Sequence, residues 1–193
     1  SPSRIIAGNV NVNTEKILFF GDSITMLFNS KGYSYVKYVE RYLQEQGFIP
    51  NIFYNGHDGE GSDWGKKNIQ SVLNSYNPKP TIVVLAWGMN DMGYCEKDLD
   101  ISGRLQGVRA DLIAQINVLT NQNIRPIIMT PIPVKDSDAW HAQSLNQDPN
   151  CDYNQHLDAL ATMMKTQMDV QVIDVRNDFK TALAGSTQNM YDG

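Results

Sequence analysis

Ser23 stands where a nucleophile is well placed, in the pentapeptide Gly21-Asp22-Ser23-Ile24-Thr25. The apolar run Ile17–Phe20 directly precedes this pentapeptide, so we expect Ser23 in a turn at the carboxyl end of a strand. A serine hydroxyl becomes a strong nucleophile when a base takes its proton, and the amides at the start of a following helix can bind the charge that develops. The alternative is that Ser23 only caps that helix.

The pentapeptide and two later motifs together resemble the GDSL, or SGNH, hydrolase family. Gly-Asp-Ser-Ile-Thr is similar to the first block of that family, and Gly88-Met89-Asn90-Asp91 is similar to its Gly-x-Asn-Asp block. The stretch Gly56–Ser62 is similar to its glycine loop, and the resemblance covers residues 17–193. Met26 stands where members often carry a small residue, so the pocket wall beside Ser23 is expected to differ.

The resemblance implies a serine ester hydrolase that needs no cofactor. Ser23 would attack the acyl carbon, while its own amide, the amide of Gly59 and the side chain of Asn90 would hold the oxyanion. Gly56 and Gly61 stay open as alternatives to Gly59. The structural alternative is an ordinary turn glycine at Gly59 and an Asx turn at Asn90.

We expect the base that activates Ser23 to lie beyond Gly193. The family pairs its serine with a C-terminal Asp-x-x-His, in which His is the base and Asp orients it. Asp192 matches this Asp, and the sequence stops before the position of the His. Of the histidines in the chain, His57 is nearest in sequence to the expected site, where it would contact substrate; a role as the base is the alternative.

Charge and aromatic residues restrict the substrate class. With 16 Lys plus Arg against 21 Asp plus Glu, the net charge is −5, so we expect neither nucleic acid nor an anionic membrane as partner. The longest apolar run, Ile82–Trp87, is too short to cross a bilayer. Trp64 and Trp140 flank the expected site in sequence, and aromatic faces can hold sugar rings; core packing is the alternative.

The glycine loop followed by Trp64 is similar to carbohydrate acetyl esterases of the family. We therefore expect a glycan or small-molecule ester as substrate, with O-acetyl groups on a sugar favoured. A lipase, thioesterase or lysophospholipase is the alternative within the enzyme class. A glycan-binding module that has kept the scaffold without catalysis is the alternative outside it.

Metal and cysteine patterns point to no further chemistry. Asp136-x-Asp138 lacks the later Gly and Glu of a calcium loop, and His57-Asp58-x-Glu60 lacks the helical spacing of zinc ligands, so we expect no metal. Cys95 and Cys151 should both lie on the edge of the sheet that carries the site. They form either a disulfide that pins the loop or two free thiols.

Five short β-branched runs alternate with segments of helical periodicity, which predicts a single α/β domain. We expect a three-layer α/β/α, flavodoxin-like fold with a five-stranded parallel sheet over residues 15–193, after a polar leader at 1–14. The irregular stretch 131–152 should overhang the carboxyl edge, where such sheets bind ligands. The predicted strands are Ile17–Phe20, Ile49–Tyr54, Thr81–Trp87, Arg125–Thr130 and Val170–Val175, and the predicted helices lie around 36–43, 69–73, 105–119 and 157–168.

The position of the base gives the first prediction. Without an imidazole, the serine should keep only the ~10³–10⁴-fold acceleration over water that the oxyanion donors and binding supply, so adding the next ~25 encoded residues should raise kcat/KM far above that level. The measurement compares both chains on a short-chain aryl ester. Equal rates would place the base within residues 1–193 and make His57 the leading candidate.

Overall fold

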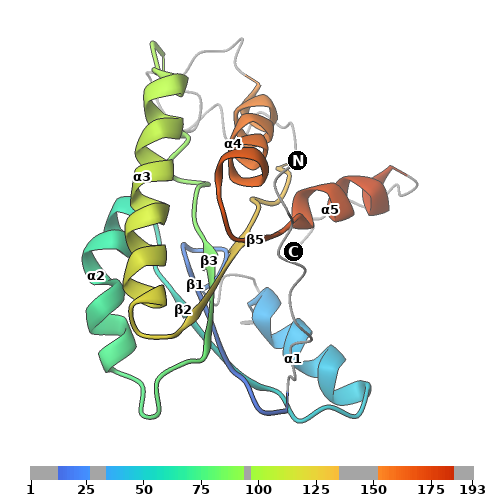
Figure 1. Ribbon diagram of the computed structural model, residues 1–193. Coiled ribbons are helices and arrows are strands. Elements are labelled where there is room, and N and C mark those ends of the chain that lie inside the picture. The colour runs from blue at the N-terminus through green and yellow to red at the C-terminus, as the bar shows by residue number, and fades with distance from the viewer. Residues whose placement is uncertain (1–12, 27–33, 94–96, 135–151, 185–193) are drawn as a thin grey trace.

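The computed structural model describes residues 13–26, 34–93, 97–134 and 152–184 (Figure 1). Strands and helices alternate along these residues. In chain order they are β1 (Lys16–Gly21), α1 (Tyr35–Glu45), β2 (Asn51–Gly56), α2 (Ser62–Asn74), β3 (Ile82–Ala86), α3 (Ile101–Thr120), β4 (Arg125–Met129), α4 (Tyr153–Gln167), β5 (Gln171–Ile173) and α5 (Val175–Leu183).

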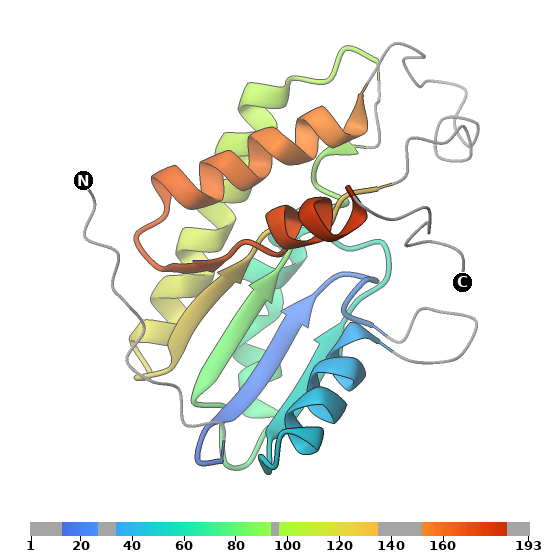
Figure 2. The same ribbon diagram turned by 90° about the vertical axis from the view of Figure 1, so that its right-hand side faces the viewer.

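The five strands form one parallel sheet in the order β2-β1-β3-β4-β5, which is the flavodoxin-like order. Helices α2, α3 and α4 cover one face, and α1 and α5 cover the other (Figures 1 and 2). The predicted three-layer α/β/α architecture is thus confirmed. Within the described ranges, no helix is both long and apolar enough to cross a membrane.

The central strands are buried on both faces, which explains why they read as continuous apolar runs. Along β1, Leu18 and Phe20 pack into the larger core, together with buried side chains of α2, α3 and α4. Phe19, between them, packs into a smaller core with Val36 of α1 and Ile52 of β2. This alternation is the two-residue period of a strand between two layers.

Helix α5 was missed by the sequence prediction, which extended the fifth strand to Val175. The strand ends at Ile173 because Asp174 caps a new helix, its side chain accepting a hydrogen bond from the Asn177 amide at 3.2 Å. Val175, Phe179 and Leu183 recur every four residues along this nine-residue helix, but the sequence prediction assigned Val175 to the strand.

Candidate active site

Three neighbouring strand ends lie in register at the carboxyl edge of the sheet. Gly21, which ends β1, is opposite Gly56 of β2 on one side and Ala86 of β3 on the other. Ser23 follows the first of these ends, and Gly59 and Asn90 follow the other two. The tertiary structure therefore gathers on one edge three of the residues that the sequence predicted for the site.

The backbones at these ends approach more closely than side chains would allow. A Cβ atom added to Gly21 would lie 2.4 Å from the carbonyl oxygen of Ala86. One added to Gly56 would lie 2.1 Å from the amide nitrogen of Met26, which belongs to the turn after β1. The turn that carries Ser23 is therefore folded directly over the end of β2.

Ser23 sits in a turn held together by Asp22. The Asp22 carbonyl accepts from the amides of Thr25 and Met26, both at 3.1 Å, and its Oδ1 accepts from the Ile24 amide at 2.9 Å. Residues 22–26 form this Asx-type turn, and the helix predicted around 36–43, α1, begins at Tyr35. Amides for an oxyanion near Ser23 must come from the turn itself.

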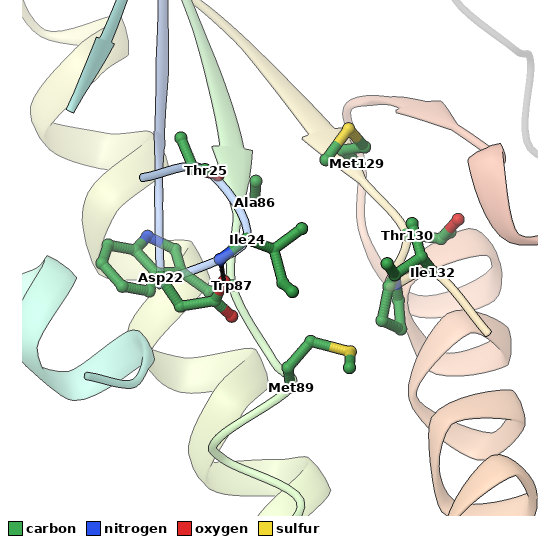
Figure 3. A pocket seen from close by; sticks show the side chains of 10 residues that line it. Asp22, Ile24, Thr25, Ala86, Trp87, Met89, Met129, Thr130 and Ile132 are labelled. Carbon is green, nitrogen blue, oxygen red and sulfur yellow. Dashed lines mark hydrogen bonds between the residues drawn. The ribbon is translucent and has the colours of Figure 1, made fainter. Parts of the chain in front are cut away.

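A pocket opens beside this turn, between Ile24 and Met89 on one side and Met129, Thr130 and Ile132 on the other (Figure 3). The Asp22 carboxyl also lines it. Its Oδ2 is buried and has no hydrogen-bond partner among the described residues. Burial raises the pKa of Asp22 to about 7, and the nearby Asp91 carboxylate adds to the rise. The wall of the pocket is otherwise mostly apolar.

The turn after β3 is tied to its surroundings at three consecutive residues. The Tyr153 hydroxyl donates to the Met89 carbonyl. Asn90 Nδ2 donates to the Glu60 carbonyl at 2.7 Å. Asp91 accepts from the Ser62 amide, at 2.9 and 3.1 Å to its two oxygens, and its Oδ1 is hydrogen-bonded to the Ser62 hydroxyl at 2.6 Å. The bond to Glu60 fixes the plane of the Asn90 carboxamide and, with it, the direction of its second N–H.

The same contact distinguishes between the candidate glycines. In a trans peptide the C=O and N–H bonds point in opposite directions. The Glu60 carbonyl faces the Asn90 carboxamide, so the N–H of Gly61, which belongs to the same peptide, points away from that carboxamide. Gly56 lies within β2, paired with β1. Gly59 is exposed, has a φ of +71°, and has no atom within 4 Å of the place a Cβ would take. Gly59 therefore stays the predicted donor.

His57 lies beside the turn of Ser23, with its amide donating to the Gly21 carbonyl at 2.9 Å. Its ring stacks on Trp64, with 3.8 Å between centroids and a tilt of 33°, and its Nε2 is hydrogen-bonded to Asn55 Oδ1. Burial lowers the pKa of His57, which favours the neutral form of the ring. These contacts fix the ring as part of an aromatic surface next to the site.

Other predicted residues fall elsewhere. Trp87 is core, with 1% of its surface exposed. Asp192, Trp140, Cys95 and Cys151 lie outside the described residues. In the part of the chain that the structure describes, no three His, Cys, Asp or Glu side chains are grouped to hold a metal ion.

The sequence reading missed what supports the site. Ser62 and the Glu60 carbonyl hold the turn after β3, and their hydrogen bonds cross between separate loops. One signal was present in the sequence: Asp111 and Gln115 interrupt the apolar face of the predicted third helix, and both contact Ser62.

Comparison with known proteins supports the reading from the site. The model of the GDSL-like lipase/acylhydrolase family matches residues 19–193. Two solved structures share the fold at 21% identity. An acetylxylan esterase from Geobacillus stearothermophilus, Axe2, has a TM-score of 0.67 over 92% of this chain and 84% of that one, and AlinE4, an SGNH-hydrolase family esterase, has 0.61 over 93% and 86%. Among curated protein sequences, none matches significantly.

The buried Asp22 carboxyl gives a prediction about stability and pH. Its pKa rises from 3.8 to about 7 on folding, so its stabilising contribution is complete below pH 3.8 and is lost as the pH rises towards 7. Asp22→Asn keeps an oxygen for the Ile24 amide and removes this loss. The free energy of unfolding of the variant relative to wild type should therefore increase between pH 4 and pH 8, by about 4 kcal/mol at most.

Urea denaturation of both proteins at several pH values measures this difference. The exposed Asp63, whose pKa is lowered by its hydrogen bond to Lys67, provides the matched control Asp63→Asn. A difference between Asp22→Asn and wild type that stays constant with pH would contradict a raised pKa.

Proposed function

The chain belongs to the GDSL-like lipase/acylhydrolase family and is a serine ester hydrolase, and we propose that it removes O-acetyl or other short acyl groups from a carbohydrate. The observation that carries the proposal is the register of β1, β2 and β3, which brings Ser23, Gly59 and Asn90 to one sheet edge. Each residue then has a place in one acyl-transfer site.

In the proposed mechanism, the Ser23 hydroxyl attacks the acyl carbon and passes its proton to a general base, which returns it to the leaving alcohol, and Asp192 is proposed to orient that base. The amides of Ser23 and Gly59 and the Asn90 carboxamide donate to the oxygen that becomes negatively charged. Collapse of this intermediate releases the alcohol, and water then cleaves the acyl-serine by the same steps. A serine variant and an aspartate variant of Axe2 are described as catalytic mutants, which supports the roles of Ser23 and Asp192.

The preference for short acyl groups rests on the pocket beside Ile24. Its cavity volume is about 20 Å³, which leaves room for little more than one group of the size of a water molecule or a methyl group. The side chains of Met89, Met129 and Ile132 suit a methyl group better than a charged one. A long acyl chain would need a channel beyond this pocket.

The preference for a carbohydrate rests on the aromatic surface next to the Ser23 turn. The stacked rings of His57 and Trp64 present an apolar face with polar edges, which suits a sugar ring. Trp140 is a second candidate contact. Axe2, which shares the fold, is described as an acetyl-xylooligosaccharide esterase.

The test of this function is the dependence of rate on acyl length. We expect kcat/KM for p-nitrophenyl acetate to exceed that for the octanoate ester by ~10-fold or more, because the pocket excludes the longer chain. Ser23→Ala should abolish hydrolysis of both esters and labelling by a fluorophosphonate, while Ser71→Ala, on the exposed face of α2, should change neither.

Acetate release from an acetylated xylo-oligosaccharide then tests the carbohydrate. Faster cleavage of the octanoate would favour a lipase or thioesterase. Binding of the oligosaccharide with no hydrolysis or labelling would favour the glycan-binding alternative. Labelling that persists in Ser23→Ala would overturn Ser23 as the nucleophile.

A second prediction concerns the oxyanion. The Asn90 carboxamide is proposed to bind charge that exists only in the transition state, so Asn90→Ala should lower kcat by ~10²–10³-fold with little change in KM. Steady-state kinetics on p-nitrophenyl acetate measure both constants. Asn74→Ala, at the exposed end of α2, is the matched control. An unchanged kcat in Asn90→Ala would refute the role.

A further inference from the structure

Helix α3 carries two polar residues on its buried face. Asp111 and Gln115 lie among Val108, Leu112 and Leu119, and they are 8% and 0% exposed. A polar side chain buried in such a face costs free energy unless it is hydrogen-bonded. Both side chains reach the same residue of the neighbouring helix α2, which is its first residue, Ser62.

The contacts to Ser62 use different atoms. The Ser62 hydroxyl donates to Asp111 Oδ2 at 3.1 Å, and Gln115 Nε2 donates to the Ser62 carbonyl at 3.2 Å. Gln115 is held in turn by the Trp87 indole N–H, which donates to its Oε1 at 3.1 Å. Asp111 also pairs with Lys66, one turn further along α2. Helix α3 thus fixes the position of the first turn of α2 through these contacts.

Ser62 is also the residue that holds Asp91. Its hydroxyl lies 2.6 Å from Asp91 Oδ1, so it bridges the carboxyl groups of Asp91 and Asp111. A hydroxyl can do this because it has one hydrogen to donate and two lone pairs to accept with. Burial raises the pKa of Asp91, which favours a protonated carboxyl facing the hydroxyl. Asn90, the neighbour of Asp91, donates to the carbonyl of Glu60, which lies two residues before Ser62.

We propose that Ser62 and Asp111 are positioning residues for the oxyanion donors. Resting on the proposed function, this inference assigns them the task of holding Asp91, and through it the Asn90 carboxamide, in the geometry that the transition state requires. Neither residue touches the substrate. Their contacts form a chain from α3 through Ser62 and Asp91 to Asn90, so a disturbance at Asp111 reaches the carboxamide.

Stability alone does not explain this arrangement. Buried charged groups are often replaced by apolar residues of similar size without loss of stability, because the cost of desolvation offsets the gain from pairing. Asp111 occupies such a place between Val108 and Leu112, where a leucine would suit the helix. A precise loop position is what the polar network adds, and small misplacement of a catalytic group lowers rate strongly.

The test removes one link at a time. Ser62→Ala deletes the bridging hydroxyl and keeps the amide that donates to Asp91. Asp111→Asn keeps a polar group of the same shape next to Ser62. Ser71→Ala, on the exposed face of the same helix α2, removes a hydroxyl that donates to the Asn68 carbonyl, outside the network, and is the matched control. For each, kcat and KM are measured with p-nitrophenyl acetate, and the Asn90 side-chain amide signals are recorded by NMR.

We expect Ser62→Ala to lower kcat by ~10-fold or more with KM nearly unchanged, Asp111→Asn to lower it less, and both to shift the Asn90 signals. Ser71→Ala should leave kcat and these signals unchanged. Thermal unfolding of each variant shows whether the fold persists, and rates are compared only well below the transition.

Two outcomes separate this proposal from the proposed function. If the Asn90 signals and kcat in Ser62→Ala equal those of wild type, the positioning role is overturned while the esterase stands. If wild type neither hydrolyses the ester nor takes up a fluorophosphonate, the proposed function fails. A shift of the Asn90 signals in the Ser62 and Asp111 variants would then still support the coupling between α3 and the turn after β3.

Discussion

The close approach of main chains at the ends of β1, β2 and β3 is the constraint on which the site depends. A side chain at Gly21 would strike the carbonyl of Ala86, and one at Gly56 would strike the turn at Met26. Because both positions lack a Cβ atom, the backbone of the Ser23 turn packs directly against the end of β2. The loops after β2 and β3 then emerge beside the nucleophile, as expected at the switch point of a parallel sheet.

Polar contacts between the loops complete what the strands begin. The turn after β3 is attached to α4 through Tyr153 and to the start of α2 through Ser62, and its Asn90 reaches the Glu60 carbonyl. Each bond joins residues from different elements. These hydrogen bonds between separate elements hold the turn after β3 in place and orient its side chains towards the neighbouring loop.

Burial shifts the pKa values of Asp22 and His57, which lie on either side of the Ser23 turn, in opposite directions. Asp22 has one oxygen satisfied by the Ile24 amide and the other buried without a partner among the described residues, and its pKa rises accordingly. His57 is partly buried on Trp64, and its pKa falls. Desolvation disfavours the charged form of both, so the walls beside the proposed nucleophile are less charged at neutral pH than the sequence suggests. A neutral ester suits such a site.

Local patterns in the sequence predict the five strands, four of the five described helices and the motifs that carry chemistry. The apolar runs of β1 and β3 and the helical periods of α2, α3 and α4 are local patterns, and Gly-Asp-Ser and Gly-Met-Asn-Asp can be read without knowing their neighbours. Helix α5 was missed, because the side-chain cap at Asp174 that ends the fifth strand was not recognised. The turn after β1 was expected, whereas the hydrogen bond from the Ile24 amide to Asp22 within it was not.

Which residues support the proposed catalytic groups depends on the packing of elements that are distant in the chain. Ser62, Asp91 and Asp111 belong to three separate elements, and no spacing along the chain predicts that one hydroxyl bridges both carboxyls. The choice of Gly59 over Gly61 likewise depends on the direction of one peptide plane. Sequence patterns report which face of an element is buried, whereas the partners that meet there are set by the packing of helices and strands distant in the chain.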